Sequence, residues 1–160
     1  MSRAVLSVGS NLGDRLGFLR QAVAGFAAEL VAVSPVYETA PWGVTDQDDF
    51  LNAVLVVAGD LGPWEWLRRG QGLEDASGRV RTLRWGPRTL DVDVVTVDGV
   101  VSDDPKLLLP HPGAHERATV LVPWLDVEPG AVLPGHGRVA DLVADLDLGG
   151  VTRRDDLRLA

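Results

Sequence analysis

Residues 74–93 read EDASGRVRTLRWGPRTLDVD, an arginine-rich loop that runs directly into an apolar segment with two aspartates. In a chain whose formal net charge is −8, this loop carries four arginines: Arg79, Arg81, Arg84 and Arg88. The apolar segment predicts a strand over residues 90–97, and side chains two apart on a strand point to the same face. Asp91 and Asp93 therefore form one acidic pair at the start of that strand, with Val92 on the opposite face.

The pairing of carboxylates with arginines favours a polyphosphate site. Two carboxylates this close repel each other unless a cation lies between them. Hard cations such as Mg²⁺ bind carboxylate oxygens and complete their shell with water and substrate phosphate. Guanidinium groups match phosphate oxygens bidentately. The alternative is a solvated loop whose arginines pair with nearby acids, but the Trp85-Gly86-Pro87 sequence indicates a shaped backbone that positions them.

Composition limits the other possible functions. With 160 residues, 46% of them hydrophobic and 24% charged, the chain fits one globular domain. The sequence pI of about 4.7 argues against a nucleic-acid or anionic-membrane binder, which needs a broad basic surface. The absence of cysteine excludes disulfides and thiolate zinc sites. Lys106 does not follow a glycine-rich loop, which excludes a Walker-type phosphate site. Without an apolar segment of membrane-spanning length or a signal peptide, a cytoplasmic location is expected.

Upstream of the central stretch, the apolar patterns alternate between strand and helix. Residues 4–8 predict a core strand, and helical spacing predicts an amphipathic helix from residue 16 to about residue 30. Residues 31–38 predict a strand broken by Pro35, followed by a long polar loop. A β-prone strand over 50–58 and a helix over 63–76, with Pro63 as its first residue, complete this half.

Downstream, the elements are shorter. Asp98-Gly99 predicts a tight hairpin that returns onto Val100-Val101. Short helices are expected over 116–125, ended by Pro123, and over 139–146, with an irregular segment between them. We expect residues 1–148 to form the single domain and residues 149–160 a mobile tail. The order strand, helix, strand, strand, helix, strand predicts an α+β fold of the ferredoxin-like split β-α-β type, an antiparallel sheet with helices packed on it.

With these elements in place, the sequence resembles the 6-hydroxymethyl-7,8-dihydropterin pyrophosphokinases of folate biosynthesis. The resemblance covers about residues 4–130. The matching segments are residues 9–13, 37–39, 41–43, 50–52, 78–81, 84–93 and 110–112, together with Gln47, Glu74 and Arg117. The most specific of them is RWGPRTLDVD at 84–93.

The resemblance implies transfer of the β,γ-pyrophosphoryl group of ATP to the pterin hydroxymethyl oxygen, with release of AMP. It implies that Asp91 and Asp93 hold two Mg²⁺ ions, and that Arg79 and Arg88 grip the phosphates as further catalytic residues. It also implies that the partners are ATP and the pterin. We further expect a monomeric enzyme that binds neither nucleic acid nor membrane.

The same resemblance assigns the two substrate sites. The implied ATP contacts are Gln71, Glu74, Arg81, Arg84, Trp85, Val94, His111 and Arg117. The implied pterin contacts are Gly9, Thr39, Ala40, Trp42, Phe50 and Asn52. Phe50 matches one of two rings that sandwich the pterin, although it could equally be a core residue. His111 could instead be a histidine that packs a loop.

This chain departs from the family pattern at the second sandwiching ring, whose position falls at Thr119. One stacking face is therefore expected to be missing unless Trp42 or another tryptophan supplies it. Two rival functions stay open: a nucleotide-sensing module on the same fold, and an RNA-binding domain. Retention of both aspartates and both gripping arginines disfavours the first. The net negative charge of the chain disfavours the RNA-binding domain, which needs a basic face with exposed aromatic residues.

Overall fold

A computed structural model describes residues 1–40, 47–79 and 88–159. Arg81, Arg84, Trp85 and Trp42 lie outside these ranges, so their predicted contacts stay predictions. The helices are α1 (Arg15–Gly25), α2 (Pro63–Ala76), α3 (Ala118–Val127) and α4 (Val139–Ala144), with 3₁₀ turns at Ala27–Glu29 and Ala114–Glu116. The strands are β1 (Ser2–Ser10), β2 (Leu30–Val33), β3 (Tyr37–Thr39), β4 (Phe50–Gly59), β5 (Asp91–Val97), β6 (Ser102–Asp104), β7 (Leu107–Leu109), β8 (Val132–Leu133), β9 (Gly137–Arg138) and β10 (Val151–Arg153).

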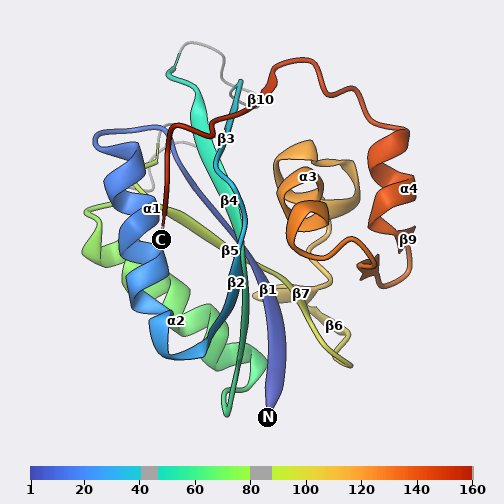
Figure 1. The fold of residues 1–160 in the computed structure, drawn as a ribbon. Coiled ribbons are helices and arrows are strands. Elements are labelled where there is room, and N and C mark those ends of the chain that lie inside the picture. The colour runs from blue at the N-terminus through green and yellow to red at the C-terminus, as the bar shows by residue number, and fades with distance from the viewer. Residues whose placement is uncertain (41–46, 80–87, 160) are drawn as a thin grey trace.

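One antiparallel sheet organises the molecule. Its strands follow the order β10-β3-β4-β1-β5, and β2 also pairs with β4. In Figure 1, α1 and α2 lie on one face of this sheet, and α3 and α4 lie on the other. The predicted α+β class, with helices packed on an antiparallel sheet, is confirmed. None of the helices in the described ranges is long and apolar enough to span a membrane.

Strand alternation produces two cores. Leu6, Leu55 and Val57 point toward α1 and α2, where they pack with Phe26 and Trp66. Val5, Val54 and Val95 are buried in a second cluster that includes residues of α3 and α4, among them Trp124 and Val139. Because successive side chains of a strand point to opposite faces, each central strand contributes to both cores.

The contact between α2 and β5 depends on a glycine inside the helix. A side-chain carbon at Gly70 would lie 2.9 Å from Cγ1 of Val92, too close for the present spacing. Gly70 costs helix propensity but allows α2 to approach the strand that carries the acidic pair. This approach positions Glu74, one turn further along α2, beside β5.

Three predicted elements differ in the structure. The strand expected over 31–38 with a break at Pro35 forms as two separate strands, β2 and β3, and between them the Ser34 N–H donates to the Val54 carbonyl (2.9 Å). The first helix ends at Gly25 instead of near residue 30. Pro123 does not end α3, which continues to Val127, because Pro123 is buried and that burial offsets the one backbone bond that proline cannot donate.

The segments after β5 and after residue 149 also differ from expectation. The Asp98-Gly99 turn forms, with Gly99 at φ 73°, but Val100 makes only an isolated bridge to Val97 and the next strand begins at Ser102. Residues 151–153, predicted as part of a mobile tail, form β10 at the edge of the main sheet, since the N–H and C=O groups along β3 accept a further strand. The main sheet therefore includes residues beyond 148, and the mobility expected of residues 149–160 stays a prediction.

Candidate active site

The acidic pair lies at the start of β5, as the sequence predicts. Asp91 and Asp93 are partly exposed, whereas Val92 and Val94 between and beyond them are buried. On the neighbouring strand β1, Gly9 stands opposite Asp91 and Ser7 stands opposite Asp93. The two carboxylates therefore share one face of the sheet with the end of β1.

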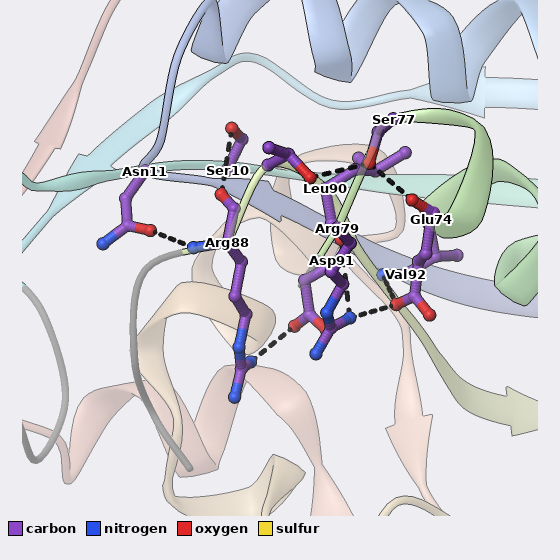
Figure 2. A network of polar contacts seen from close by, with 10 residues as sticks. Ser10, Asn11, Glu74, Ser77, Arg79, Arg88, Leu90, Asp91 and Val92 are labelled. Atoms are coloured by element: carbon purple, nitrogen blue, oxygen red, sulfur yellow. Dashed lines mark hydrogen bonds and ion pairs between the residues drawn. The ribbon is translucent and has the colours of Figure 1, made fainter. Parts of the chain in front are cut away.

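Two arginines converge on the Asp91 carboxylate, as Figure 2 shows. Arg79 donates from Nη1 to Oδ1 of Asp91 at 2.9 Å, and Arg88 donates from Nη1 to Oδ2 at 3.1 Å. Among the described residues, Nε of Arg79 is buried without a hydrogen-bond partner. A buried donor without a partner is costly to folding.

Glu74 fixes Arg79 from the other side. Its Oε2 accepts from Nη1 of Arg79 at 2.6 Å and from the backbone N–H of Val92 at 2.8 Å, and the residue is only 5% exposed. One buried carboxylate thus ties α2 to β5 and orients a guanidinium (Figure 2). The resemblance predicted Glu74 as an ATP contact. In the structure its carboxylate binds Arg79, and the predicted contact with ATP stays a prediction.

The pKa of Asp93 is raised well above its usual range. Burial of the carboxyl group is the main cause, and the negative charge of Asp91 adds to it. Charges on Glu74 act in the same direction, whereas Arg117 acts against them. The ionised form of this carboxylate is therefore unfavourable unless a cation is nearby.

A pocket opens beside the acidic pair and contains most of the predicted pterin contacts. It is lined by Ser7, Gly9, Thr39, Ala40, Phe50, Asn52, Arg88, Asp91, Asp93, Arg117, Thr119 and Val120. Thr119 lies on this wall, which agrees with the position inferred for the missing second ring. The sequence alone did not indicate Ser7 or Val120. Ser7 could not be found from the sequence, because its place beside Asp93 depends on the register in which β1 pairs with β5.

The polar floor of this pocket is built from β1, β3 and β4. Asn52 is buried and donates from Nδ2 to Oγ1 of Thr39 at 2.8 Å. Asn52 stands opposite Gly9, where a side-chain carbon would lie 2.8 Å from its Oδ1. Glycine is therefore required at position 9, since any side chain there would displace the amide.

A second pocket lies on the other side of Asp93. It is lined by Leu67, Val92, Asp93, Val94, Pro105, Lys106, Leu107, Leu108, His111 and Pro112. Burial lowers the pKa of His111, and the Arg117 charge lowers it further, so its imidazole is neutral near pH 7. Asp93 lines both pockets and so marks their shared boundary. Of the predicted ATP contacts, Val94 and His111 meet here, Arg117 faces the first pocket, and Gln71 is exposed on α2.

Asn11 connects the ends of two loops that border the site. Its Nδ2 donates to Oε1 of Gln47 at 2.8 Å and to the carbonyl of Asp48 at 2.9 Å. Its Oδ1 accepts from the backbone N–H of Arg88 at 2.8 Å, and its own N–H donates to the Arg88 carbonyl at 3.0 Å. A single buried amide therefore fixes the backbone from which the Arg88 side chain extends.

The donor set is suited to a hard divalent cation. Two carboxylates stand together and the pKa of one is raised by the charge of the other, a repulsion that a cation would relieve. No group of three or more metal-binding side chains is found within the described ranges. Mg²⁺ does not require one, because it is commonly bound by one or two carboxylates together with substrate phosphates. Asp91 and Asp93 thus fit a magnesium site that substrate completes.

The sequence is also similar to those of known proteins. A 2-amino-4-hydroxy-6-hydroxymethyldihydropteridine pyrophosphokinase of Mycobacterium tuberculosis is 48% identical over 99% of this chain and 90% of its own length. The enzyme of the same name from Methylorubrum extorquens is 44% identical over 96% of this chain and 99% of its own length.

Solved structures show the same fold at low sequence identity. A crystal structure of an HPPK-DHPS in complex with substrates matches with a TM-score of 0.69 at 10% identity, over 89% of this chain. This chain spans only 43% of that protein. Residues 5–129 match the family described as 7,8-dihydro-6-hydroxymethylpterin-pyrophosphokinase (HPPK). By this match and by its relatives, the chain belongs to the HPPK family.

Proposed function

We propose that this chain transfers the β,γ-pyrophosphoryl group of ATP to the hydroxyl of 6-hydroxymethyl-7,8-dihydropterin, releasing AMP, as a Mg²⁺-dependent step of folate biosynthesis. The observation that supports it best is the position of the acidic pair. Asp93 lines two pockets at once, and Asp91 beside it is held by Arg79 and Arg88. This arrangement suits a reaction in which a phosphate chain from one pocket meets an acceptor in the other.

The first pocket suits the pterin. The Asn52 amide can present both a donor and an acceptor to the polar edge of a heterocycle, and Thr39 holds that amide in place. Phe50 supplies an aromatic wall. The hydroxymethyl group of a pterin bound there would face Asp91 and Asp93, which line the same pocket.

The second pocket suits the nucleoside. Its walls are mainly apolar, from Leu67, Val94 and Leu107, with a neutral His111 that can donate or accept a hydrogen bond. The triphosphate would extend from there across Asp93 toward Arg79 and Arg88. Arg117, at the N-terminus of α3, lines the far side of the pterin pocket and adds positive charge.

The chain's own groups bind, orient and neutralise charge. When bound, two Mg²⁺ ions would screen the triphosphate and lower the pKa of the attacking hydroxyl, and Asp91 and Asp93 would hold them. The pterin oxygen forms a bond to the β-phosphorus, the bond from that phosphorus to the α,β-bridging oxygen breaks, and the hydroxyl proton is lost to solvent. Arg79 and Arg88 offset the charge that develops on the transferred group.

The assay that tests this function detects AMP. The protein is incubated with ATP, Mg²⁺ and reduced hydroxymethylpterin, and the nucleotides are separated by chromatography. Equal amounts of AMP and pterin diphosphate are expected, without ADP. ADP as the product, or no turnover despite tight nucleotide binding, would contradict the proposal and favour a simple kinase or a nucleotide-sensing module. A monomeric state and a cytoplasmic location remain predictions.

Thr119→Phe is expected to tighten pterin binding with little change in ATP binding. Thr119 lines the pterin pocket, so a ring there would supply a second stacking face. Such a stack contributes on the order of 0.5–1.5 kcal/mol beyond burial, or about two- to tenfold in affinity. Pterin dissociation constants of the parent, Thr119→Phe, Trp42→Ala and the double variant measure this.

Trp42 is the competing source of that stacking face. If Trp42 already covers it, Thr119→Phe weakens binding through a clash, and Trp42→Ala also weakens it. Contacting side chains would then give non-additive effects in the double variant. Unchanged pterin affinity in both single variants would show that neither residue faces the pterin.

A further inference from the structure

The segment that follows Gly150 lies directly behind the wall of the pterin pocket. Its strand β10 pairs with β3, so that Val151 is opposite Thr39, Thr152 opposite Glu38 and Arg153 opposite Tyr37. Thr39 lines the pterin pocket and accepts the hydrogen bond of the Asn52 amide. A side-chain carbon at Gly150 would lie 3.9 Å from Cβ of Ala40, the next residue of the same wall.

Apart from β10, β3 is held by β4 and by the hydroxyl of Tyr37, which donates to the Asp126 carboxylate of α3. β3 has three residues and pairs on its other side with β4. Without β10 it would be a short edge strand, and such strands fray more readily than internal ones because half of their backbone groups lose their partners. The position of Thr39 and Ala40 therefore depends on a segment more than 100 residues later in the sequence.

A charged cluster fastens β10 to β3. Arg154 donates from its backbone N–H to the Val36 carbonyl at 2.8 Å and from Nη1 to Oε1 of Glu38 at 2.9 Å. Glu38 also accepts from Nη1 of Arg15 at 2.7 Å, and Arg15 in turn donates to the Asp49 carbonyl at 2.9 Å. Both ends of the loop between β3 and β4 are thus held through one carboxylate. The two arginines lower the pKa of Glu38, with the Arg15 hydrogen bond contributing most.

The rest of the segment is anchored on the helical layer. Leu157 and Leu159 pack against the core that α1 and α2 share, and the carbonyl of Arg158 accepts from Nε of Arg20 at 2.9 Å. Figure 1 shows this red segment passing β3 and ending beside α1. Asp156 accepts two hydrogen bonds from Arg154, at 3.0 and 2.8 Å, which orients the guanidinium toward Glu38.

We propose that β10 and Arg154 act as a positioning element for the pterin site, holding β3 so that Thr39 and Ala40 keep the shape of the pocket wall. Arg154 acts through its ion pair with Glu38 and contacts neither substrate. This inference rests on the proposed function, because it assigns the supported pocket to the pterin. ATP binds from β5 and the second pocket, which β10 does not contact, so only one substrate should be affected.

Arg154→Ala tests the proposal, with Arg158→Ala as the matched control. Arg158 lies in the same segment and carries the same charge, but its side chain is exposed, and among the described residues its backbone carbonyl, not its guanidinium, accepts the bond from Arg20. Pterin dissociation constants are measured by calorimetry in the presence of Mg²⁺ and a non-hydrolysable ATP analogue, and the analogue is titrated separately. Loss of one partly buried ion pair is expected to weaken pterin binding about three- to tenfold.

Three further readouts separate positioning from general destabilisation. In Arg154→Ala, the pterin KM should rise with kcat and the ATP KM nearly unchanged, and amide exchange over residues 37–40 should accelerate more than exchange in β1. Arg154→Lys should restore part of the affinity, because an ammonium group can still pair with Glu38. In Glu38→Gln, the Arg154→Ala change should have little additional effect, since the shared interaction is already weakened.

The outcomes separate the two proposals. If the parent protein does not bind the pterin, the proposed function fails. If the parent binds and Arg154→Ala binds equally well, within about twofold, the positioning role is wrong. Equal weakening of pterin and ATP binding would also overturn it, because the effect would then be a loss of overall stability.

Discussion

Replacing Asp93 by asparagine is expected to lower kcat/KM by at least about 10³-fold while making the metal-free protein more resistant to heat. Activity falls because the site loses one of two carboxylates suited to hold Mg²⁺. Stability rises because the pKa of Asp93 in the folded state is raised by burial and by Asp91. A raised folded-state pKa means that stability is fully present below the unfolded-state pKa and is lost as pH rises through the folded-state pKa. Asparagine carries no charge and avoids that loss at neutral pH.

Asp91→Asn separates the two effects. It should lose activity to a similar extent but should also lose stability, because Asp91 accepts from both Arg79 and Arg88. Asp103→Asn, at an exposed position on β6, is the control and should change neither property. Thermal unfolding without metal and steady-state kinetics at saturating Mg²⁺ measure the outcome. Near-normal activity of either site variant at ordinary Mg²⁺ would refute the assignment of the metal to this pair.

Glu74→Ala is expected to destabilise the protein by about 3–5 kcal/mol, because it leaves a buried arginine without its closest partner and the Val92 N–H without an acceptor. Activity should fall as well, since Arg79 would no longer be held at the site. Urea unfolding measures the first effect, and the kcat of the fraction that remains folded measures the second.

Two companion variants identify the cause. Glu74→Gln keeps an acceptor for Val92 but loses the charge that orients Arg79, so it should recover much of the stability and little of the activity. Arg68→Ala, at an exposed position on the same helix, should behave like the parent. If Glu74→Ala unfolds at the same urea concentration as the parent, the carboxylate does not tie α2 to β5.

Several features of the site follow from local sequence. Asp91 and Asp93 lie on one face because alternation along a strand is a property of two neighbouring residues and needs no distant partner. The start of α2 at Pro63 follows from local backbone chemistry in the same way. The match of residues 84–93 to a known family carried the functional assignment, because that segment combines the acidic pair with the arginines.

Other features required knowledge of the pairing between strands. The close approach of α2 to β5 at Gly70 places Glu74 where it binds Arg79 and the Val92 N–H, which no local pattern indicated, and its contact with ATP stays a prediction. Pro123 was expected to end a helix, but it is buried inside α3, which continues past it to Val127. At Pro123 the free energy gained by burial outweighs the local tendency of proline to break a helix.

The sequence by itself determined the family, the α+β class and the residues of the acidic and arginine-rich centre, because each of these depends on short-range spacing. The tertiary structure alone decided that Ser7 faces the same pocket as Asn52, that Asp93 stands between two pockets, and that residues 151–153 pair with the strand that carries Thr39. Such contacts join segments many residues apart, and their register is set by how both faces of the sheet are buried, which no single stretch of sequence encodes.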